Sequence, residues 1–401
     1  MNNQTILLAY SGGLDTSVCI RWLQEEHQAR VVALTIDLGM VDLEEIKQRA
    51  LQIGAAEALT VDGKDTFIRD YVFPALKAGA IYEEQYPLAT ALGRPLIARY
   101  LVEAARQVGA SAIAHGCTGK GNDQVRMDIS VGALAPEIKV IAPVREWGWN
   151  REQEIEYAKN HNIPIQERKS RFSTDENLWG RSIEAGDLED PWLEPPEDAF
   201  AWTAPADKTP NEALYIDVAF RRGVPVALNG EEMSPVNLVQ HLNDLAGRHG
   251  IGRIDHIENR LVGIKSREVY EAPAGIVLHN SHKALETMTL SKEQLRMKQR
   301  TAQEYADVVY NGLWYTAHRQ DLDSYVESTQ RHVTGTVRVK FQKGSCTVVG
   351  RQAPQALYSH QLATYDRGDT FDHRASEGFI SIYGLPVRTQ AQQQSEDRHD
   401  G

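Results

Sequence analysis

The chain has 401 residues, of which 42% are hydrophobic and 24% are charged, and its formal net charge is -12 at pH 7. A chain of this length exceeds what one hydrophobic core usually organises, so we expect two domains. The acidic balance argues against a surface built to bind nucleic acid, because neutralising phosphates requires clustered Lys and Arg.

The sequence also lacks the marks of export and of membrane insertion. The N-terminus has no basic region, and no apolar run approaches the roughly 20 residues that a membrane helix needs. The three cysteines, Cys19, Cys117 and Cys346, lie far apart without a Cys-x-x-Cys pair. This spacing indicates a reducing compartment and no zinc site. We therefore expect a cytoplasmic protein without a membrane partner.

The N-terminal part alternates short apolar runs with helix-like segments. Strands are predicted at residues 5–9, 31–37, 58–61, 112–114 and 138–142, and helices at 16–26, 43–53, 95–108 and 151–160. In the helix predicted at 95–108, Ile97, Leu101, Ala104 and Val108 share one face, and Pro95 stands in its first turn. This alternation is typical of a parallel sheet with helices on both faces, so the expected fold class is doubly wound α/β.

The composition changes between residues 173 and 210, where acidic and proline-rich stretches surround four aromatic residues, Trp179, Trp192, Phe200 and Trp202. We interpret this stretch as a crossing segment whose aromatic side chains are buried. Beyond it, strands are predicted at residues 214–220, 224–228, 260–265, 276–278 and 333–342, and helices near 236–245 and 291–317. This mixture indicates a second domain of the α+β class.

The first glycine turn carries the strongest functional signal. Directly after the strand at 5–9, the sequence is Ala9-Tyr10-Ser11-Gly12-Gly13-Leu14-Asp15-Thr16-Ser17. The two glycines can bring backbone N–H groups close to a ligand, and short polar side chains surround them, which suits a pyrophosphate. The run fits neither a Walker A loop nor a Rossmann fingerprint. It resembles the pyrophosphate loop of the N-type ATP pyrophosphatases; an ordinary glycine-rich βα turn is the alternative.

A second glycine-rich run follows the strand predicted at 112–114, with the sequence His115-Gly116-Cys117-Thr118-Gly119-Lys120-Gly121-Asn122-Asp123. Ligands of open parallel sheets bind beyond the carboxyl ends of the strands, so both loops are expected to face one cleft. Lys120 could neutralise phosphate oxygens or a carboxylate, and Arg126 is a planar cation suited to a carboxylate. The alternatives are a simple turn and a solvated surface arginine.

With both loops present, the chain resembles the argininosuccinate synthases over nearly its whole length. Residues 86–99, 173–182, 250–260 and 265–275 carry the similarity further. The resemblance implies ATP-dependent condensation of L-citrulline with L-aspartate to argininosuccinate, AMP and pyrophosphate, through a citrullyl-adenylate, in arginine biosynthesis. Another synthetase of the ATP pyrophosphatase type and a catalytically inactive nucleotide-binding regulator are the alternatives.

The resemblance also implies an organisation and partners. It divides the chain into a nucleotide-binding domain of the adenine-nucleotide α-hydrolase type over residues 1–168, a synthetase and multimerisation domain over 169–365, and a C-terminal tail over 366–401. The last residues of the tail are expected to be frayed. A homotetramer is implied, with the stretch from Phe379 to Tyr383 as a plausible contact. The implied cofactors are ATP as co-substrate and Mg²⁺.

Site residues follow from the resemblance, position by position. The implied ATP-binding residues are Ala9, Tyr10, Ser11, Gly12, Gly13, Leu14, Asp15, Thr16, Ser17, Ile36 and Gly116. The implied aspartate-binding residues are Thr118, Asn122 and Asp123. The implied citrulline-binding residues are Tyr86, Thr90, Asn122, Arg126, Ser173, Ser182, Glu258 and Tyr270. The expected catalytic residues are Asp15, Lys120 and Asp123, and Asp15 is a possible ligand of a Mg²⁺ ion that arrives with ATP.

Three positions depart from the family pattern. Ala91 stands where many members have a serine, which leaves Thr90 to supply a hydroxyl group to citrulline. Ile36 stands where the family often has alanine near the adenine, and backbone contacts would survive that change. Met40 replaces a frequent glutamine.

Overall fold

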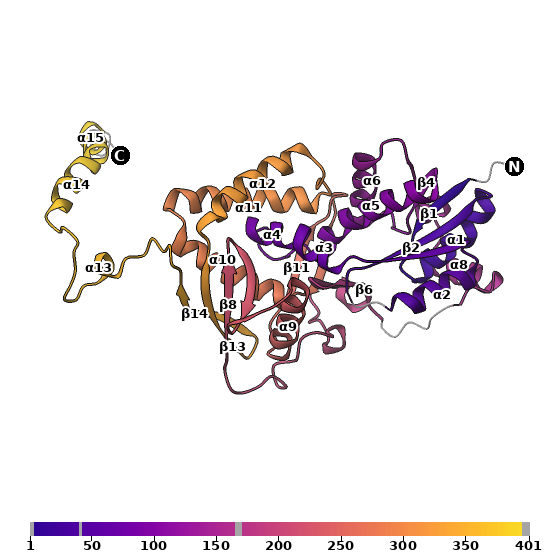
Figure 1. The fold of residues 1–401 in the computed structure, drawn as a ribbon, viewed down its shortest axis with the longest axis horizontal. Coiled ribbons are helices and arrows are strands. Elements are labelled where there is room, and N and C mark those ends of the chain that lie inside the picture. Colours follow the sequence, from indigo (N-terminus) through magenta and orange to yellow (C-terminus); the bar gives the residue numbers. More distant parts are fainter. Residues whose placement is uncertain (1–3, 40–41, 165–170, 395–401) are drawn as a thin grey trace, which may run out of the picture. The chain divides into compact units, whose positions relative to one another are not determined.

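The computed structural model describes residues 4–39, 42–164 and 171–394 (Figure 1). The described residues up to Gln355 form one compact unit, and those from Ala356 onward form a second. Among the described residues, no helix combines the length and the apolar character needed to cross a membrane. Met40 lies outside the described residues.

A parallel sheet organises the N-terminal part of the first unit. Its strands are β1 (Thr5–Ala9), β2 (Arg30–Asp37), β3 (Glu57–Asp62), β4 (Ala112–Ala114) and β5 (Lys139–Ile141). Their order is β3-β2-β1-β4-β5, and every neighbouring pair is parallel. The predicted doubly wound sheet is therefore confirmed. The order reverses between β1 and β4, where a crevice opens at the carboxyl ends of such strands.

Alternating side chains of β1 bury the two faces of this sheet. Ile6 and Leu8 belong to a core with α1 (Leu14–Glu26), α2 (Leu43–Ile53) and α8 (Arg151–Asn160). Leu7 belongs to the opposite core, with α5 (Ala89–Val108) and α6 (Asp123–Leu134). Because successive strand side chains point to opposite faces, two apolar neighbours in sequence fill two separate cores.

Helix α5 begins earlier than predicted. It starts at Ala89, and Pro95 lies inside it instead of in its first turn. Its first residues, among them Ala91, Leu92 and Gly93, are buried. Packing of this turn in the large core of the first unit therefore outweighs the cost of a proline within a helix. Four shorter elements complete this part: α3 (Lys64–Phe67), the π-helical turn η1 (Ile68–Val72), α4 (Phe73–Ala78) and α7 (Pro143–Trp147).

The acidic segment, interpreted from the sequence as a crossing segment, contains two strands that were not predicted. It begins with a hairpin of β6 (Ser173–Asn177) and β7 (Gly180–Glu184), which joins an antiparallel sheet with β11 (Arg253–Asn259) and β12 (Lys265–Glu271). The predicted strand at 260–265 is wrong, because most of it forms the turn between β11 and β12. Trp179 is buried as expected, whereas Trp192 is 93% exposed, which contradicts its predicted burial.

A second antiparallel sheet has the order β10-β9-β8-β13-β14. Its bounds are β8 (Leu214–Arg221), β9 (Val224–Leu228), β10 (Glu231–Glu232), β13 (Gly335–Gln342) and β14 (Ser345–Gln352). The helices of this part are α9 (Pro235–Arg248), α10 (Pro273–Thr289), α11 (Lys292–Tyr310) and α12 (Ala317–Thr329), with short 3-10 turns η2 (Gly186–Glu189), η3 (Glu197–Ala199) and η4 (Gln330–His332). The strand predicted at 276–278 is wrong, since these residues belong to α10. The helix predicted at 291–317 ends at Tyr310, and the next helix, α12, begins only at Ala317.

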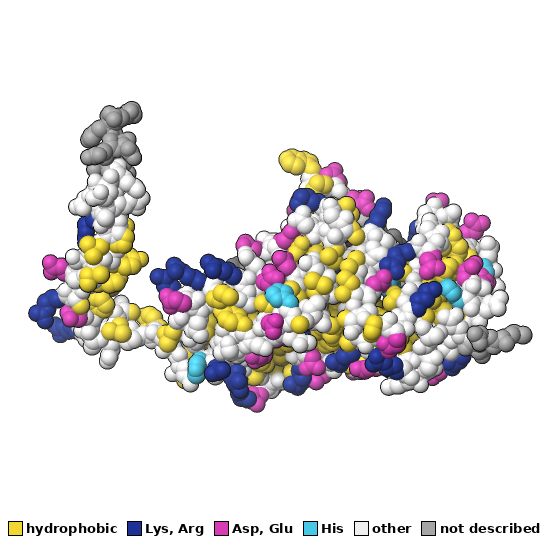
Figure 2. Space-filling model, turned by 90° about the horizontal axis from the view of Figure 1, so that it is seen from above, with side chains coloured by type: hydrophobic (Ala, Val, Ile, Leu, Met, Phe, Trp, Pro, Cys, Tyr) yellow, Lys and Arg dark blue, Asp and Glu magenta, His cyan; other side chains and the backbone are white. Residues whose placement is uncertain are grey.

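In its described residues, the second unit has three helices, α13 (His360–Ala363), α14 (Ala375–Tyr383) and α15 (Leu385–Gln393). Large apolar side chains of this unit remain exposed, including Phe379, Ile382 and Tyr383. Figure 2 shows hydrophobic side chains gathered along these helices. An apolar surface of this kind is typical of a protein–protein contact.

Candidate functional site

The first glycine loop is folded by its own hydroxyl groups. Ser11 Oγ lies 3.1 Å from Thr16 Oγ1 and accepts a hydrogen bond from the backbone N–H of Gly13 at 3.4 Å. Gly12 adopts a φ of 80°, a left-handed conformation that glycine reaches without strain. None of the side chains that the structure describes caps the start of α1. The first N–H groups of this helix are therefore available to an anion.

Two other residues of this loop are engaged with the protein interior. Ser17 is 1% exposed, and its Oγ lies 3.1 Å from the hydroxyl oxygen of Tyr10. Thr35 donates a hydrogen bond to the Tyr10 carbonyl oxygen at 2.9 Å, which ties the loop to β2. Ser17 thus contacts the buried side of the loop, through Tyr10, in this structure.

The two glycine loops touch. A Cβ atom built on Gly116 would stand 2.8 Å from Thr16 Cγ2, so only glycine fits this contact without a shift. A cavity of about 370 Å³ lies beside it. Of the predicted ATP-binding residues, those that line this cavity are Ala9, Tyr10, Ser11, Thr16, Ile36 and Gly116. The nucleotide cavity, as we call it, therefore opens where both loops meet at the carboxyl ends of β1 and β4.

Asp15 stands in the first turn of α1, outside the lining of the nucleotide cavity. Its Oδ1 accepts a hydrogen bond from Arg151 Nη1 at 2.8 Å. Burial, together with the nearby charge of Asp15, raises the pKa of Glu154 to about 8. Asp15 of α1 and Arg151 and Glu154 of α8 thus form a small cluster of ionisable groups beside the loop.

A smaller cavity, the amino-acid cavity, gathers residues from distant parts of the chain. Its volume is about 90 Å³. The predicted residues that line it are Tyr86, Thr90, Asn122, Asp123, Arg126, Ser182, Glu258 and Tyr270. The structure therefore brings together eight side chains that the resemblance assigned to citrulline or aspartate.

Glu258 is held by two tyrosines. Tyr310 donates a hydrogen bond to its Oε1 at 2.5 Å, and Tyr270 donates one to its Oε2 at 2.6 Å. His256 Nε2 lies 3.6 Å from Oε2. Burial raises the pKa of Glu258, but His256 and the two tyrosines outweigh it, so the net pKa lies below the ordinary value. The side chain is therefore a carboxylate at neutral pH and can accept a ligand ammonium group.

Arg126 is a buried cation with one unused nitrogen. It is 3% exposed; its Nε donates to the Tyr310 carbonyl oxygen and its Nη1 to Asp123 Oδ1, both at 2.9 Å. Its Nη2 is buried and makes no hydrogen bond with any residue that the structure describes. Burying a donor without a partner costs free energy of desolvation. A ligand carboxylate that accepts a hydrogen bond from this nitrogen would recover that free energy.

Thr90 and Ala91 lie differently on α5. Thr90 lines the amino-acid cavity, and its Oγ1 lies 2.8 Å from the hydroxyl oxygen of Tyr86. Ala91 is fully buried and does not line the cavity. The hydroxyl group available at this point of the helix is therefore that of Thr90.

Eight predicted residues lie outside both cavity linings: Gly12, Gly13, Leu14, Asp15 and Ser17 of the first loop, and Thr118, Lys120 and Ser173. Thr118 and Lys120 are exposed in the second loop, and Ser173 is half-buried at the start of β6. Among the described residues, Lys120 has neither a hydrogen-bond partner nor an ion-pair partner. Its side chain is free to approach a bound phosphate or carboxylate.

Two charged residues that sequence reasoning missed join the cavities. Arg94 lines the nucleotide cavity, and its Nη2 donates to Asp123 Oδ2 at 2.7 Å and to Asp175. Asp175 lines both cavities. Both residues stand inside stretches that carry the family resemblance, which was the available signal. Tyr310 was missed as well, and its polar helix gave no signal.

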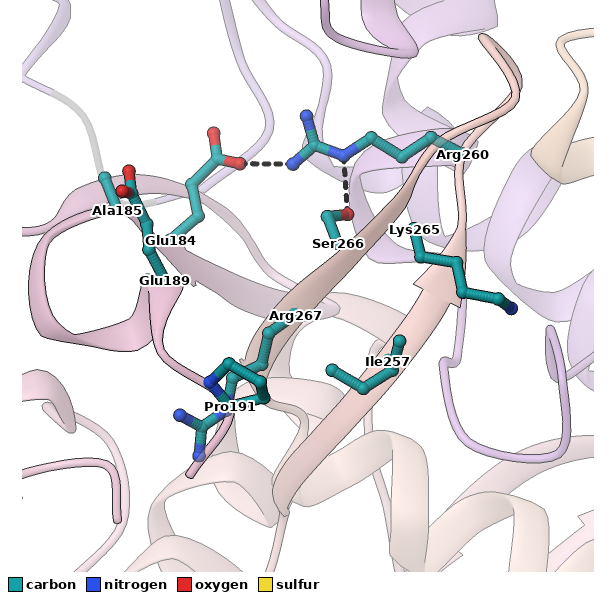
Figure 3. A pocket seen from close by; sticks show the side chains of 9 residues that line it. All are labelled: Glu184, Ala185, Glu189, Pro191, Ile257, Arg260, Lys265, Ser266 and Arg267. Carbon is teal, nitrogen blue, oxygen red and sulfur yellow. Dashed lines mark hydrogen bonds and ion pairs between the residues drawn. The ribbon is translucent and has the colours of Figure 1, made fainter. Parts of the chain in front are cut away.

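A wider cavity of about 480 Å³ adjoins the amino-acid cavity (Figure 3). Glu184 and Arg260 line both. As Figure 3 shows, Arg260 reaches Glu184 and Ser266, with its Nη2 2.7 Å from Glu184 Oε2 and its Nε 2.7 Å from Ser266 Oγ. Arg260 also binds Glu268, whose pKa burial raises to about 7. This group of four residues separates the two cavities.

Comparison with known proteins shows similarity along the chain. The family model of the arginosuccinate synthase N-terminal HUP domain matches residues 5–164, and that of the C-terminal domain matches residues 172–390. The chain is 56% identical over 394 residues to the argininosuccinate synthase of Dehalococcoides mccartyi, which covers 98% of this chain and 97% of the relative. It is 55% identical over 394 residues to that of Symbiobacterium thermophilum, which covers 98% of each chain.

Solved structures align with less of the chain. The NAD+ synthetase of Burkholderia pseudomallei has a TM-score of 0.28 and 21% identity, and the alignment covers 40% of this chain and 60% of that one.

Proposed function

Because the chain belongs to the argininosuccinate synthase family, we propose that its reaction takes place across the nucleotide and amino-acid cavities. That reaction is the ATP-dependent condensation of citrulline with aspartate in arginine biosynthesis. One observation carries the proposal: Asp175 lines both cavities, and Arg94 links it to Asp123. Two substrates bound in these cavities would have their reactive groups next to each other.

ATP occupies the nucleotide cavity in this proposal. Its phosphates lie against the first glycine loop, from Ala9 to Ser17, and against Gly116, while its base approaches Ile36. The uncapped start of α1 offers backbone N–H groups, and Lys120 adds a positive charge. The helix end alone contributes only about 0.3–1 kcal/mol, so most of the binding must come from the backbone donors and the cations.

Mg²⁺ is proposed to arrive with the nucleotide. Within the described residues, no group of three or more His, Cys, Asp or Glu side chains could hold a metal ion. Mg²⁺ commonly binds through phosphate oxygens and only one or two carboxylates, so a single carboxylate at the loop fits it. Asp15 is the residue proposed to hold it. When bound, the ion would neutralise negative charge on the phosphates.

Citrulline occupies the amino-acid cavity. Its carboxylate is proposed to pair with Arg126 and its ammonium group with Glu258, while Tyr86, Thr90, Asn122, Ser173, Ser182 and Tyr270 surround the rest. A zwitterion needs one cation and one anion, and the unused Nη2 of Arg126 and the ionised Glu258 supply them.

Aspartate is proposed to bind beside it, at Thr118, Asn122 and Asp123. The ureido carbon of citrulline is a poor electrophile, so its oxygen first attacks the α-phosphorus and pyrophosphate leaves. The amine of aspartate then displaces AMP from the citrullyl-adenylate. Asp15, Lys120 and Asp123 are the residues proposed to assist these steps, because each can orient or balance charge at the reacting groups.

We also propose the domain division at 1–168, 169–365 and 366–401, a cytoplasmic location, and a homotetramer. The exposed Phe379, Ile382 and Tyr383 of α14 support the last of these, since burying them would lower the free energy of association.

The test is to mix purified protein with ATP, Mg²⁺, citrulline and aspartate while AMP is followed. Omitting each component in turn should abolish argininosuccinate formation. AMP formation that needs neither amino acid would contradict the proposal and favour another activity of the same loop.

A further inference from the structure

Arg94 lies where the two cavities adjoin. Its side chain is 18% exposed and lines the nucleotide cavity, while both of its carboxylate partners line the amino-acid cavity. Only Nη2 is used: it donates to Asp123 Oδ2 at 2.7 Å and to Asp175. Nε and Nη1 make no hydrogen bond with any residue that the structure describes. Arg94 therefore keeps unused donors at the boundary between the two proposed substrates.

We propose that Arg94 is a catalytic residue that binds the α-phosphate of ATP during adenylylation and exchanges Asp123 for that phosphate. The inference rests on the proposed function. In the first step, a bond forms between the ureido oxygen and the α-phosphorus. The bond from that phosphorus to the pyrophosphate oxygen breaks, and pyrophosphate leaves with the electron pair.

The position of Arg94 follows from the geometry of that step. The attacking oxygen belongs to the amino-acid cavity and the phosphorus to the nucleotide cavity, so the two atoms must meet at the boundary. The guanidinium group has parallel N–H donors that match two oxygens of one phosphate. Charge on these oxygens is greatest while the new bond forms, and a fixed cation there lowers the barrier.

The exchange links the two steps of the reaction. In the structure both oxygens of Asp123 accept hydrogen bonds from arginines, Oδ1 from Arg126 and Oδ2 from Arg94. A carboxylate held in this way is poorly available to the ammonium group of aspartate. When Arg94 turns to the α-phosphate, Oδ2 is released. ATP therefore increases the affinity of the site for aspartate.

The first experiment measures pyrophosphate release in a single turnover, with ATP, Mg²⁺ and citrulline but no aspartate. Arg94→Gln should slow release about 100- to 1,000-fold, while the dissociation constant of ATP changes less than tenfold. Arg94→Lys keeps the positive charge but lacks the two parallel N–H donors of the guanidinium group. Its rate of pyrophosphate release should lie between those of the wild type and Arg94→Gln. Arg106→Gln is the matched control, since Arg106 lies on the same helix, pairs with Glu137 and lines neither cavity. It should match the wild type.

The second experiment measures aspartate affinity with and without α,β-methylene-ATP. The analogue should tighten aspartate binding in the wild type and leave it unchanged in Arg94→Gln, where Asp123 Oδ2 is always free. A merely structural role of Arg94 would not remove this linkage.

The outcomes are distinguishable. Pyrophosphate release by Arg94→Gln within threefold of the wild type, or an intact effect of the analogue, overturns the inference. A wild-type protein that forms no argininosuccinate overturns the proposed function instead. If a melting curve shows that Arg94→Gln is unfolded, Arg94→Lys is used to test the inference. A wild-type rate of pyrophosphate release in Arg94→Lys would exclude a role for the guanidinium group.

Discussion

Gly116 packs against Thr16 so closely that a methyl group at position 116 would lie 2.8 Å from Thr16 Cγ2. This contact joins the loop after β1 to the loop after β4, at the place where the strand order reverses. Residues of both turns, among them Ser11, Thr16 and Gly116, line the nucleotide cavity.

Gly116→Ala should therefore weaken ATP binding. The added methyl group must push the two loops apart, so we expect the KM for ATP to rise about tenfold, which corresponds to roughly 1.4 kcal/mol. Steady-state kinetics at saturating citrulline and aspartate will measure it. Gly119→Ala is the control, because its nearest neighbour, Arg145 Cγ, lies 3.9 Å from the added atom. Equal effects of both substitutions would show that the contact with Thr16 is unimportant.

Asp15→Ala should abolish pyrophosphate release while the fold remains intact. The carboxylate is proposed to hold Mg²⁺ or to order the loop, and the loss should exceed about 100-fold, as for other electrostatic contacts in a transition state. Arg151→Gln removes the partner of Asp15 but keeps the carboxylate, so it should stay close to wild type. Near-normal turnover of Asp15→Ala at saturating Mg²⁺ would reject the role.

Arg126→Ala should raise the KM for citrulline far more than that for ATP. A hydrogen bond to a charged group contributes about 1.5–3 kcal/mol, which predicts a rise of roughly 10- to 100-fold. Arg145→Gln breaks a comparable ion pair, with Asp128, outside both cavity linings, and should change neither constant. If Arg126→Ala affects the two substrates equally, it does not bind the citrulline carboxylate.

Thr90→Val should raise the KM for citrulline about 2- to 10-fold, because it removes one neutral hydrogen-bonding group from the amino-acid cavity. The neighbouring Ala91→Ser restores the residue that is frequent in the family, but position 91 is fully buried. It should leave the KM unchanged and lower the melting temperature. An improved citrulline KM in Ala91→Ser would show that position 91 reaches the substrate after all.

The stability of the protein should depend on pH through Glu154. Burial and the charge of Asp15 raise its pKa to about 8, against an ordinary value of 4.5. Between these two pH values the folded protein keeps a proton that the unfolded chain has lost, so the stabilising contribution falls as pH rises from about 4.5 to 8. Glu154→Gln has no titrating group at this position, so its stability should not fall in this way. Its melting temperature should exceed that of the wild type by a margin that grows up to pH 8 and reaches several degrees.

Melting curves between pH 5 and 9 will measure this margin. Glu152→Gln is the control, since Glu152 lies exposed on the same helix. A margin that does not vary with pH would show that Glu154 is ionised throughout.

The sequence predicts those parts of the site that depend on local backbone chemistry. Gly12 and Gly116 follow buried strands, and their surroundings indicate phosphate-binding turns before any fold is known. The parallel sheet also follows from alternation, because Ile6, Leu7 and Leu8 form a short apolar run of the kind that is buried on both faces.

Other parts could not be predicted because tertiary contacts decide them. Residues 173–177 are polar throughout, and they form a strand only because β7 pairs with them. The apolar run at 276–278 has no periodicity that would separate a strand from a buried helix. Tyr310 ends a polar helix, and its contacts with Asn122 and Glu258 arise only when distant segments meet.

Helix α5 belongs to two hydrophobic cores at once. Leu88, just before it, together with Leu92 and Leu96, packs in the large core of the first unit, whereas Leu101 and Val102 pack beneath the parallel sheet. A fragment that ended after the parallel sheet would therefore expose the apolar N-terminal half of α5 to water. We therefore expect the nucleotide-binding part and the rest of the unit to unfold together in a single cooperative transition.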